Sequence, residues 1–268
     1  MFNFFKKTVH KVIDLDKHFD IYLSEAEAGN VGEGYSSDQL NEYIIKKYLL
    51  AQKLDNHKNI LLQVHVMALI SIIELVRLRL NRPLKIFDFG GGCPTIPSLL
   101  DRLGLMDCVE NYRIIESPSF LLAMSRLASI EQYIAEYDGG GDLLILSSVL
   151  PYINKSTFDR LLECIENNPP RYIYFGRTSF LNENHPNDEV FTIQRSRFSD
   201  HGVQIKGEFS LDIEHQYAEY LKRHFKFSRL LSMLNKQSYK KILVLEDDSG
   251  LQSVNGLNLY TYNSLWAK

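Results

Sequence analysis

Two acidic residues, each at the end of a short apolar run, and three consecutive glycines make up the part of this sequence best suited to ligand chemistry. The segment Leu84–Thr95 reads LKIFDFGGGCPT, so Asp88 stands two residues before the first glycine. A second apolar run, YRIIES, ends in Glu116, about 20 residues further on. Glycines let a ligand approach bare backbone, and the second acid can accept hydrogen bonds from both hydroxyls of a ribose. The pattern predicts the nucleotide-binding half of an α/β protein.

The elements that would position these residues alternate between strand and helix patterns. The predicted strands are Leu84–Phe89, Arg113–Glu116, Asp142–Val149 and Arg171–Phe175, and the predicted helices between them are Ile96–Leu105, Pro118–Leu127 and Thr157–Ile165. A further strand has room only within Ile130–Tyr137. Such alternation implies an α/β fold with a mostly parallel, Rossmann-like sheet and helices on both faces.

The two ends of the chain have sequence patterns that differ from this alternation of strands and helices. Residues 1–82 are predicted to form a helical N-terminal cap, with Ser36 or Ser37 capping one helix, and residues 83–268 to form the Rossmann-like domain. After Arg177 the alternation of predicted strands and helices becomes less regular. Leu181–Asp200 is predicted to be a long loop, Asp212–Phe225 a helix, and the candidate strands are Phe227–Leu234, Lys241–Leu245 and Leu257–Leu265.

Composition limits the classes of partner and the compartment. The chain has 268 residues and a formal net charge of -3, which disfavours nucleic acid as the main partner. Its three cysteines have neither metal-ligand spacing nor a disulfide pattern, so we expect no metal site and a cytoplasmic location. The apolar run Asn59–Leu80 is interrupted by charged residues, which predicts a buried amphipathic helix and not a transmembrane segment. The oligomeric state is left open.

The residues around the glycines favour one class of nucleotide ligand. A dinucleotide fingerprint has a third glycine where this chain has Thr95. A carboxylate at Asp88 would repel phosphates on the loop, whereas a cationic or zwitterionic ligand meets no such repulsion. S-adenosylmethionine carries a sulfonium, an ammonium and a carboxylate but no phosphate, so it is the favoured cofactor. A nicotinamide-dependent oxidoreductase or epimerase on the same half-fold is the alternative.

Several segments together resemble a known group of enzymes. FDFGGG, the acid-ended second strand and DLLILSSVLPYI resemble class I S-adenosylmethionine-dependent methyltransferases. The chain is more closely similar to a family of methyltransferase-like proteins found among bacterial surface-polysaccharide genes. That resemblance covers roughly residues 20 to 180 and rests on four segments, which are EAEAGNVGEGY (Glu25 to Tyr35), DFGGG, Leu150-Pro151-Tyr152 and Arg177-Thr178.

The resemblance assigns expected roles to individual residues. The expected cofactor contacts are Asp88, Gly90, Gly91 and Gly92 at the methionine end, Glu116 and Ser117 at the ribose, Ser147 and Ser148 at the fourth strand, and Gly34 and Tyr35 closing over the cofactor. Tyr152 and Arg177 are expected to project into the crevice, where the Arg177 fork suits a carboxylate or phosphate of the acceptor; a salt bridge is the alternative. Tyr152, Arg177 and His185 are the candidate catalytic residues, and Tyr152 and His185 are the candidate bases. His185 is the histidine best placed in the sequence for that role, with a solvated loop histidine as the alternative.

The function predicted from these features is methyl transfer from S-adenosylmethionine to a hydroxyl or amine of a small molecule, such as a sugar or polysaccharide precursor. A non-catalytic, methyltransferase-like partner protein is a second alternative, because no single residue identifies itself as the catalyst. The acceptor, its reacting atom and the general base are left open by the sequence.

Overall fold

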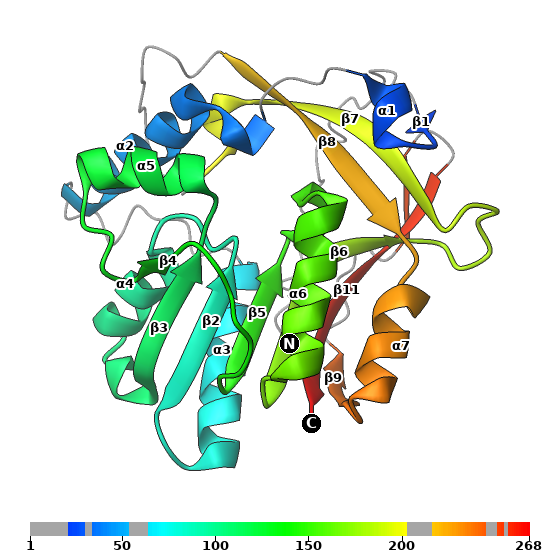
Figure 1. Ribbon diagram of the computed structural model, residues 1–268. Helices are drawn as coiled ribbons and strands as arrows, with labels where there is room; N and C mark the ends of the chain where they lie inside the picture. The colour runs from blue at the N-terminus through cyan, green and yellow to red at the C-terminus, as the bar shows by residue number, and fades with distance from the viewer. Residues whose placement is uncertain (1–20, 30–33, 54–63, 203–215, 245–250, 255–256) are drawn as a thin grey trace, which may run out of the picture.

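The computed structural model describes residues 21–29, 34–53, 64–202, 216–244, 251–254 and 257–268 (Figure 1). In chain order its elements are β1 (Ile21–Tyr22), α1 (Glu25–Ala28), η1 (Gly34–Ser36), α2 (Asp38–Lys53), α3 (Val64–Leu80), β2 (Leu84–Phe89), α4 (Thr95–Arg102), η2 (Met106–Cys108), β3 (Val109–Ile115), α5 (Pro118–Leu127), β4 (Tyr133–Ile134), β5 (Leu143–Ser147), η3 (Leu150–Tyr152), α6 (Lys155–Asn167), β6 (Tyr172–Leu181), β7 (Glu189–Arg197), η4 (Phe198–Asp200), β8 (Tyr217–Phe225), α7 (Ser228–Lys236), β9 (Lys240–Val244), β10 (Leu251–Val254) and β11 (Leu257–Ala267), where η marks a 3₁₀ turn.

Among the described residues, eight strands form the main sheet, in the order β10-β11-β6-β5-β2-β3-β4 with β9 also beside β11. The strands from β4 to β6 in this order run parallel, and β11 is antiparallel to β6 and β9. The chain builds outward from β2 to β4 and then returns to β5 on the other side of β2. Ligands of open α/β sheets bind at such a reversal, at the carboxyl ends of the strands. The predicted α/β, Rossmann-like fold class is confirmed.

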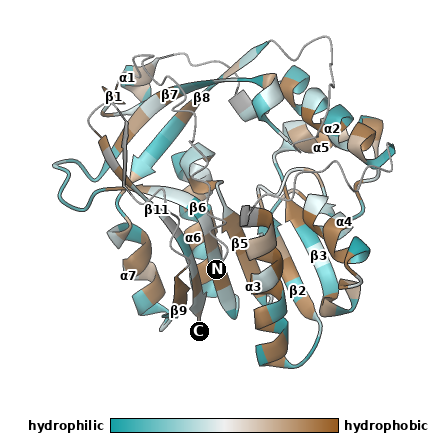
Figure 2. Ribbon diagram, turned by 180° about the vertical axis from the view of Figure 1, so that it is seen from behind, coloured by the Kyte–Doolittle hydropathy of each residue, from teal (hydrophilic) through white to brown (hydrophobic). Residues whose placement is uncertain are grey.

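Side chains of the central strands alternate between two hydrophobic clusters, one on each face of the sheet. In β5, Leu143 and Ile145 belong to the cluster that includes α2 to α5, whereas Leu144 and Leu146 belong to the cluster that includes α6 and α7. Figure 2 shows the corresponding hydrophobic colouring of β2, β5 and α3. Strands buried on both faces explain the continuous apolar runs in the sequence.

The N-terminal helices take two different positions. α3 packs on one face of the sheet and shares its cluster, while α2 lies beside α5 above the carboxyl ends of the strands (Figure 1). Ser37, one of the two predicted caps, accepts a hydrogen bond from the backbone N–H of Leu40 at 3.4 Å. In the described ranges no helix is both long and apolar enough to cross a membrane. Residues 30–33 of the segment EAEAGNVGEGY lie outside the described residues.

The predictions for the segment after Arg177 were wrong in three places. Leu181–Asp200, predicted to be a loop, contains β7, and the described part of Asp212–Phe225, predicted to be a helix, is β8. These two strands pair antiparallel over nine residues each and form a second sheet with β1. Backbone pairing over that length overrides the local helical tendency of the second segment.

Phe227–Leu234, predicted to be a strand, lies mostly in α7, whose buried residues recur at helical spacing. The strands predicted at Lys241–Leu245 and Leu257–Leu265 are confirmed as β9 and β11.

A buried carboxylate fixes the amino end of β5 to the start of β2. Asp142 is 3% exposed and accepts hydrogen bonds from Arg82 Nη1 and from the backbone N–H of Lys85, both at 2.9 Å. Arg171 Nε lies 3.6 Å from the same carboxylate. These contacts hold the central strands in register at the end of the sheet opposite the predicted ligand site.

We expect Asp142→Asn to lower the free energy of unfolding by about 2 kcal/mol, because it replaces charged hydrogen bonds by neutral ones at a buried position. Urea unfolding of the wild-type and variant proteins measures this difference. Asp138→Asn, at an exposed site in the preceding turn, is the matched control and should change stability by less than about 0.5 kcal/mol. Equal effects of the two substitutions would contradict the anchoring role of Asp142.

Candidate functional site

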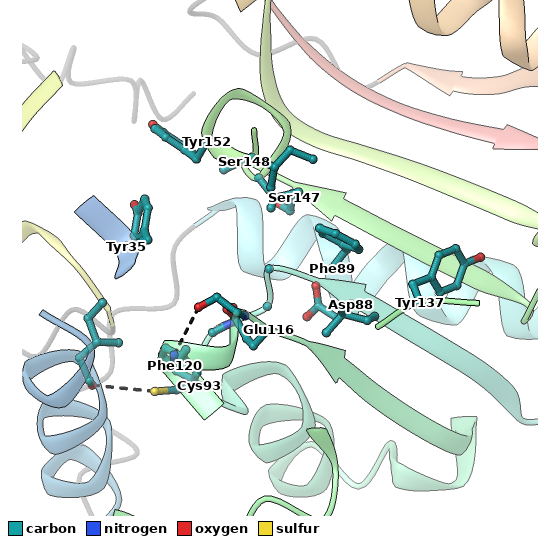
Figure 3. Close-up of a pocket in the computed structure, with 18 of the residues that line it drawn as sticks. Tyr35, Asp88, Phe89, Cys93, Glu116, Phe120, Tyr137, Ser147, Ser148 and Tyr152 are labelled. Atoms are coloured by element: carbon teal, nitrogen blue, oxygen red, sulfur yellow. Dashed lines mark hydrogen bonds between the residues drawn. The ribbon is translucent and has the colours of Figure 1, made fainter. Parts of the chain in front are cut away.

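A cavity of about 820 Å³ lies along the carboxyl edge of the main sheet. One side is formed by the glycine loop after β2 and by the ends of β3 and β5. The other side is formed by η1, α2, η3 and the residues after η4. Figure 3 shows Asp88 and Glu116 on neighbouring strand ends, with Tyr35 and Tyr152 approaching from η1 and η3. The cavity therefore occupies the strand-order reversal identified above.

The three glycines of the loop meet different requirements. A Cβ on Gly90 would lie 2.4 Å from Val149 Cγ2, and one on Gly91 would lie 2.6 Å from the carboxyl group of Asp88. Gly92 has a φ of +64°, and nothing lies within 4 Å of the position of its Cβ. Close packing thus requires the first two glycines, whereas the third has a left-handed backbone and open space before it. The loop is a backbone cradle that a ligand can approach.

Asp88 is buried beneath this cradle. It is 6% exposed, and the Tyr112 hydroxyl donates a hydrogen bond to its Oδ2 at 2.8 Å. Burial raises the pKa of Asp88, the Tyr112 hydrogen bond opposes this effect, and the charge of Glu116 adds to it; together they raise the pKa to about 7. The carboxyl group is therefore partly protonated near neutral pH, and a positive charge in the cavity would favour its ionised form.

Glu116 is held in one orientation by two backbone amides. Its Oε1 accepts a hydrogen bond from Gly92 N–H at 2.8 Å and its Oε2 accepts one from Ser117 N–H at 3.0 Å. Burial raises the pKa of Glu116, and the two amides act in the opposite direction. Each carboxylate oxygen has a second lone pair, so the group can still accept hydrogen bonds from a diol. Ser117 also caps α5, where its Oγ accepts a hydrogen bond from Phe120 N–H at 3.3 Å.

Two non-glycine residues with left-handed backbones lie side by side at the cavity. Ser148 has a φ of +58° and Arg177 a φ of +48°. The Ser148 N–H donates to Gly176 O at 2.7 Å, and the Arg177 N–H donates to Asn263 Oδ1 at 2.7 Å. Such conformations cost on the order of 1–3 kcal/mol each, and they concentrate at functional sites.

An aromatic cluster closes the side of the cavity opposite the glycine loop. The rings of Tyr35, Tyr152 and Tyr220 have centroids 5.2 to 5.4 Å apart. His201 is 8% exposed, with Nε2 2.6 Å from Ser196 Oγ and Nδ1 3.5 Å from the Tyr35 hydroxyl. Burial lowers the pKa of His201 below its usual value, so the imidazole is neutral at pH 7 and able to accept a proton.

The structure brings together most of the residues predicted from the sequence. Those that line the cavity are Tyr35, Asp88, Gly90, Gly91, Gly92, Glu116, Ser117, Ser147, Ser148, Tyr152 and Arg177. Gly34 begins the 3₁₀ turn that carries Tyr35. His185 does not line the cavity. It lies in the turn between β6 and β7, where its Nδ1 accepts a hydrogen bond from Asn187 N–H at 3.2 Å.

The sequence analysis missed two cavity residues, Asn41 and His201, and two residues that hold the cavity wall from behind. The latter are Ser196 and Tyr220, which contact His201 and Tyr35 and lie on β7 and β8. The two-residue alternation of those segments was the available signal. For His201 and Asn41 the sequence contains no pattern that would have indicated a position in the cavity. Asn41 Nδ2 donates to Tyr35 O at 3.2 Å, while its buried Oδ1 has no hydrogen-bond partner in the described part of the chain. Among the described residues there is no group of three or more His, Cys, Asp or Glu side chains that could hold a metal ion.

The fold is similar to solved structures of methyltransferases. One, from Micromonospora echinaspora, is an amino pentose methyltransferase with bound S-adenosylmethionine (10% identity, 81% of this chain and 96% of that chain covered, TM-score 0.45). Another is magnesium protoporphyrin IX methyltransferase from Synechocystis PCC 6803 (11% identity, 85% and 97% covered, TM-score 0.41). A third is 1,6-didemethyltoxoflavin-N1-methyltransferase from Burkholderia thailandensis (12% identity, 85% and 88% covered, TM-score 0.38). No protein-family model matches the sequence, and no curated protein matches it significantly. Similarities at this level transfer neither an acceptor nor a residue role to this chain.

The raised pKa of Asp88 makes the stability of the protein depend on pH. Because the folded state holds a proton on Asp88 up to about pH 7 and the unfolded state releases it near pH 4, stability falls as the pH rises between these values. The contribution is up to about 1.4 kcal/mol per pH unit. We expect Asp88→Asn to remove it, so the stability of the variant relative to wild type increases from pH 4 to pH 7 and then levels off.

Urea unfolding of both proteins between pH 5 and pH 8 measures this difference. The titration of Glu116, whose pKa is raised in the same direction, is present in both proteins, and the comparison isolates Asp88. A stability difference that does not change with pH would show that Asp88 is not a buried carboxyl group with a raised pKa.

Proposed function

We propose that this protein is an S-adenosylmethionine-dependent methyltransferase that acts on a hydroxyl or amine of a small molecule. The observation that carries this proposal is one cavity that combines an open glycine cradle, a buried acid at the end of β2 and the Glu116 carboxylate at the end of β3. The acid suits a cationic ligand, the cradle suits a ligand that contacts backbone, and Glu116 suits a diol.

The residues present are compatible with this cofactor. The space before Gly92 is open, and both oxygens of Glu116 keep a lone pair for ribose hydroxyls. The buried Oδ1 of Asn41, which lines the same cavity, is an acceptor suited to an N–H or O–H group of a ligand. Asp88 and Gly90–Gly92 would hold the methionine end. The alternative of a nicotinamide cofactor has less support, since Thr95 stands at the first residue of α4 where the dinucleotide fingerprint has glycine.

The chain supplies orientation, exclusion of water and a proton acceptor. When bound, the cofactor supplies an electrophilic methyl group on its sulfonium. Holding the acceptor in line with that group can contribute ~7–11 kcal/mol. The rings of Tyr35, Tyr152 and Tyr220 exclude water from the acceptor side. His201 replaces His185 as the proposed base, because it lines the cavity in its neutral form. The acceptor oxygen or nitrogen would lose its proton to Nδ1 while Nε2–H donates to Ser196 Oγ.

The resemblance to methyltransferase-like proteins of bacterial surface-polysaccharide genes supports a sugar or polysaccharide precursor as the acceptor. The dimensions of the cavity agree with a cofactor and a small acceptor bound side by side, since ligand sites of about 300–1,000 Å³ hold drug-sized molecules.

S-adenosylhomocysteine should bind the purified protein and raise its melting temperature, because a ligand stabilises the state that it binds. We expect Glu116→Gln to weaken this binding about 10-fold or more, by loss of charged hydrogen bonds to the ribose. Isothermal titration measures both affinities. Glu110→Gln, at an exposed position on the same strand, is the matched control and should leave the affinity unchanged. Stabilisation by NAD and none by S-adenosylhomocysteine would overturn the proposal.

His201→Gln should lower methyl transfer by about 10² to 10⁴-fold, the usual contribution of a general base. Gln retains a group that can hydrogen-bond Ser196, so cofactor binding should persist. Transfer of labelled methyl from S-adenosylmethionine to a panel of sugars and sugar nucleotides measures the rate. The wild-type rate should fall as the pH drops through the lowered pKa of His201, and the variant should lose this dependence. A similar loss in His185→Gln, with His201→Gln unaffected, would restore the base predicted from the sequence.

A further inference from the structure

A buried tyrosine of β4, Tyr133, reaches the glycine loop from outside the cavity. Its hydroxyl donates a hydrogen bond to the backbone carbonyl of Gly92 at 2.9 Å. Tyr133 itself does not line the cavity, whereas Gly92 does. Burial raises the pKa of Tyr133, so the hydroxyl keeps its proton and acts as a donor. Any effect of this side chain on a ligand is therefore transmitted through the loop.

Both polar backbone groups of Gly92 are bound by side chains from other parts of the sheet. Its N–H donates to Glu116 Oε1 at 2.8 Å, and its carbonyl accepts from Tyr133. The two groups belong to the successive peptide planes on either side of the Gly92 Cα, so the two contacts together fix both planes. Gly92 has a φ of +64°, and nothing lies within 4 Å of the position of its Cβ. Glycine has more conformational freedom than any other residue, so hydrogen bonds do here what packing does at Gly90 and Gly91.

The place of β4 in the sheet explains why a long side chain makes this contact. In the order β2-β3-β4, Tyr133 lies two strands away from the strand that carries the loop, a separation of roughly 10 Å. Tyr133 pairs with Ile114 of β3, and its ring packs against Phe120 of α5 with centroids 6.2 Å apart. A phenylalanine at this position would keep the strand pairing and the ring contact and would lose only the hydrogen bond to Gly92.

We propose that Tyr133 is a positioning residue of the cofactor site, which holds the Gly92 backbone in its binding conformation before the cofactor arrives. The inference rests on the proposed function, in which Glu116 has to hold both the Gly92 amide and the ribose hydroxyls. The hydrogen bond from Tyr133 involves no group that the cofactor uses, so it orders the loop whether or not a ligand is present. A loop ordered in advance loses less conformational entropy on binding, and ordering the backbone of one residue corresponds to roughly 5- to 30-fold in affinity.

The test compares Tyr133→Phe with Tyr239→Phe. The Tyr239 hydroxyl also donates to a backbone carbonyl, that of Pro170, and this buried tyrosine does not line the cavity. Both substitutions remove one buried hydrogen bond of the same kind, so urea unfolding should show similar losses of stability. Isothermal titration with S-adenosylhomocysteine should show binding weakened about 5-fold or more in Tyr133→Phe and unchanged in Tyr239→Phe.

Hydrogen exchange of the Gly92 amide, followed by NMR in the protein without ligand, separates positioning from a general loss of stability. We expect exchange to be about 5-fold or more faster in Tyr133→Phe and to keep the wild-type rate in Tyr239→Phe. Unchanged affinity in Tyr133→Phe, or an equal loss in both variants, would overturn the proposal. Weaker binding with unchanged exchange would also overturn it, because the hydroxyl would then act on the cofactor directly. If S-adenosylhomocysteine does not bind the wild-type protein, the proposed function fails, and the exchange rates still decide whether Tyr133 holds the loop.

Discussion

The hydrogen bond from the Gly92 amide to Glu116 is the contact on which the rest of the site depends. It ties the glycine loop after β2 to the end of β3 and so sets the floor of the cavity at the reversal of strand order. Because the carboxylate receives a second amide from Ser117, it is held beside the loop despite being largely removed from water. Its charge also acts on Asp88, whose carboxyl group lies under the same loop.

The roof of the cavity depends on contacts between segments distant in the sequence. Lys47 of α2 is buried and donates to the backbone carbonyls of Ser199 and His201, both at 2.9 Å. That contact fixes the residues after η4 against the N-terminal helix and places His201 beside Tyr35. The imidazole is bonded to Ser196 through Nε2, and its Nδ1 faces the Tyr35 hydroxyl at 3.5 Å. The second sheet thus does more than cover the site, because Ser196 on β7 and Tyr220 on β8 contact His201 and Tyr35 at the cavity wall.

Two residues at this edge of the sheet have backbone conformations that destabilise the folded protein and give the cavity its shape. Ser148 and Arg177 have left-handed backbones that a glycine would adopt more readily, and each is held by a hydrogen bond that its backbone N–H donates, to Gly176 and Asn263 respectively. Gly176 of β6, which pairs with Ser147 of β5, permits the close approach of these strands, since its Cβ would lie 2.8 Å from Ser147 Oγ. The strain and the buried carboxyl group of Asp88 both destabilise the protein, and both lie in the cavity.

The sequence by itself determined the main sheet and the side of the cavity formed by the glycine loop and the strand ends. Apolar runs, glycines and strand-ending acids are adjacent in the chain, so residues from Asp88 to Ser148 could be located by local pattern. The opposite side of the cavity was decided only by tertiary structure. Its residues come from η1, η3 and the segment after η4, which β7 and β8 position. These two strands were predicted wrong because strand pairing across 20 or more residues leaves a weaker local signal than a buried parallel strand does. His201 lines the cavity and His185 does not, and this difference comes from burial and proximity in the fold, which neither residue's immediate neighbours in the sequence specify.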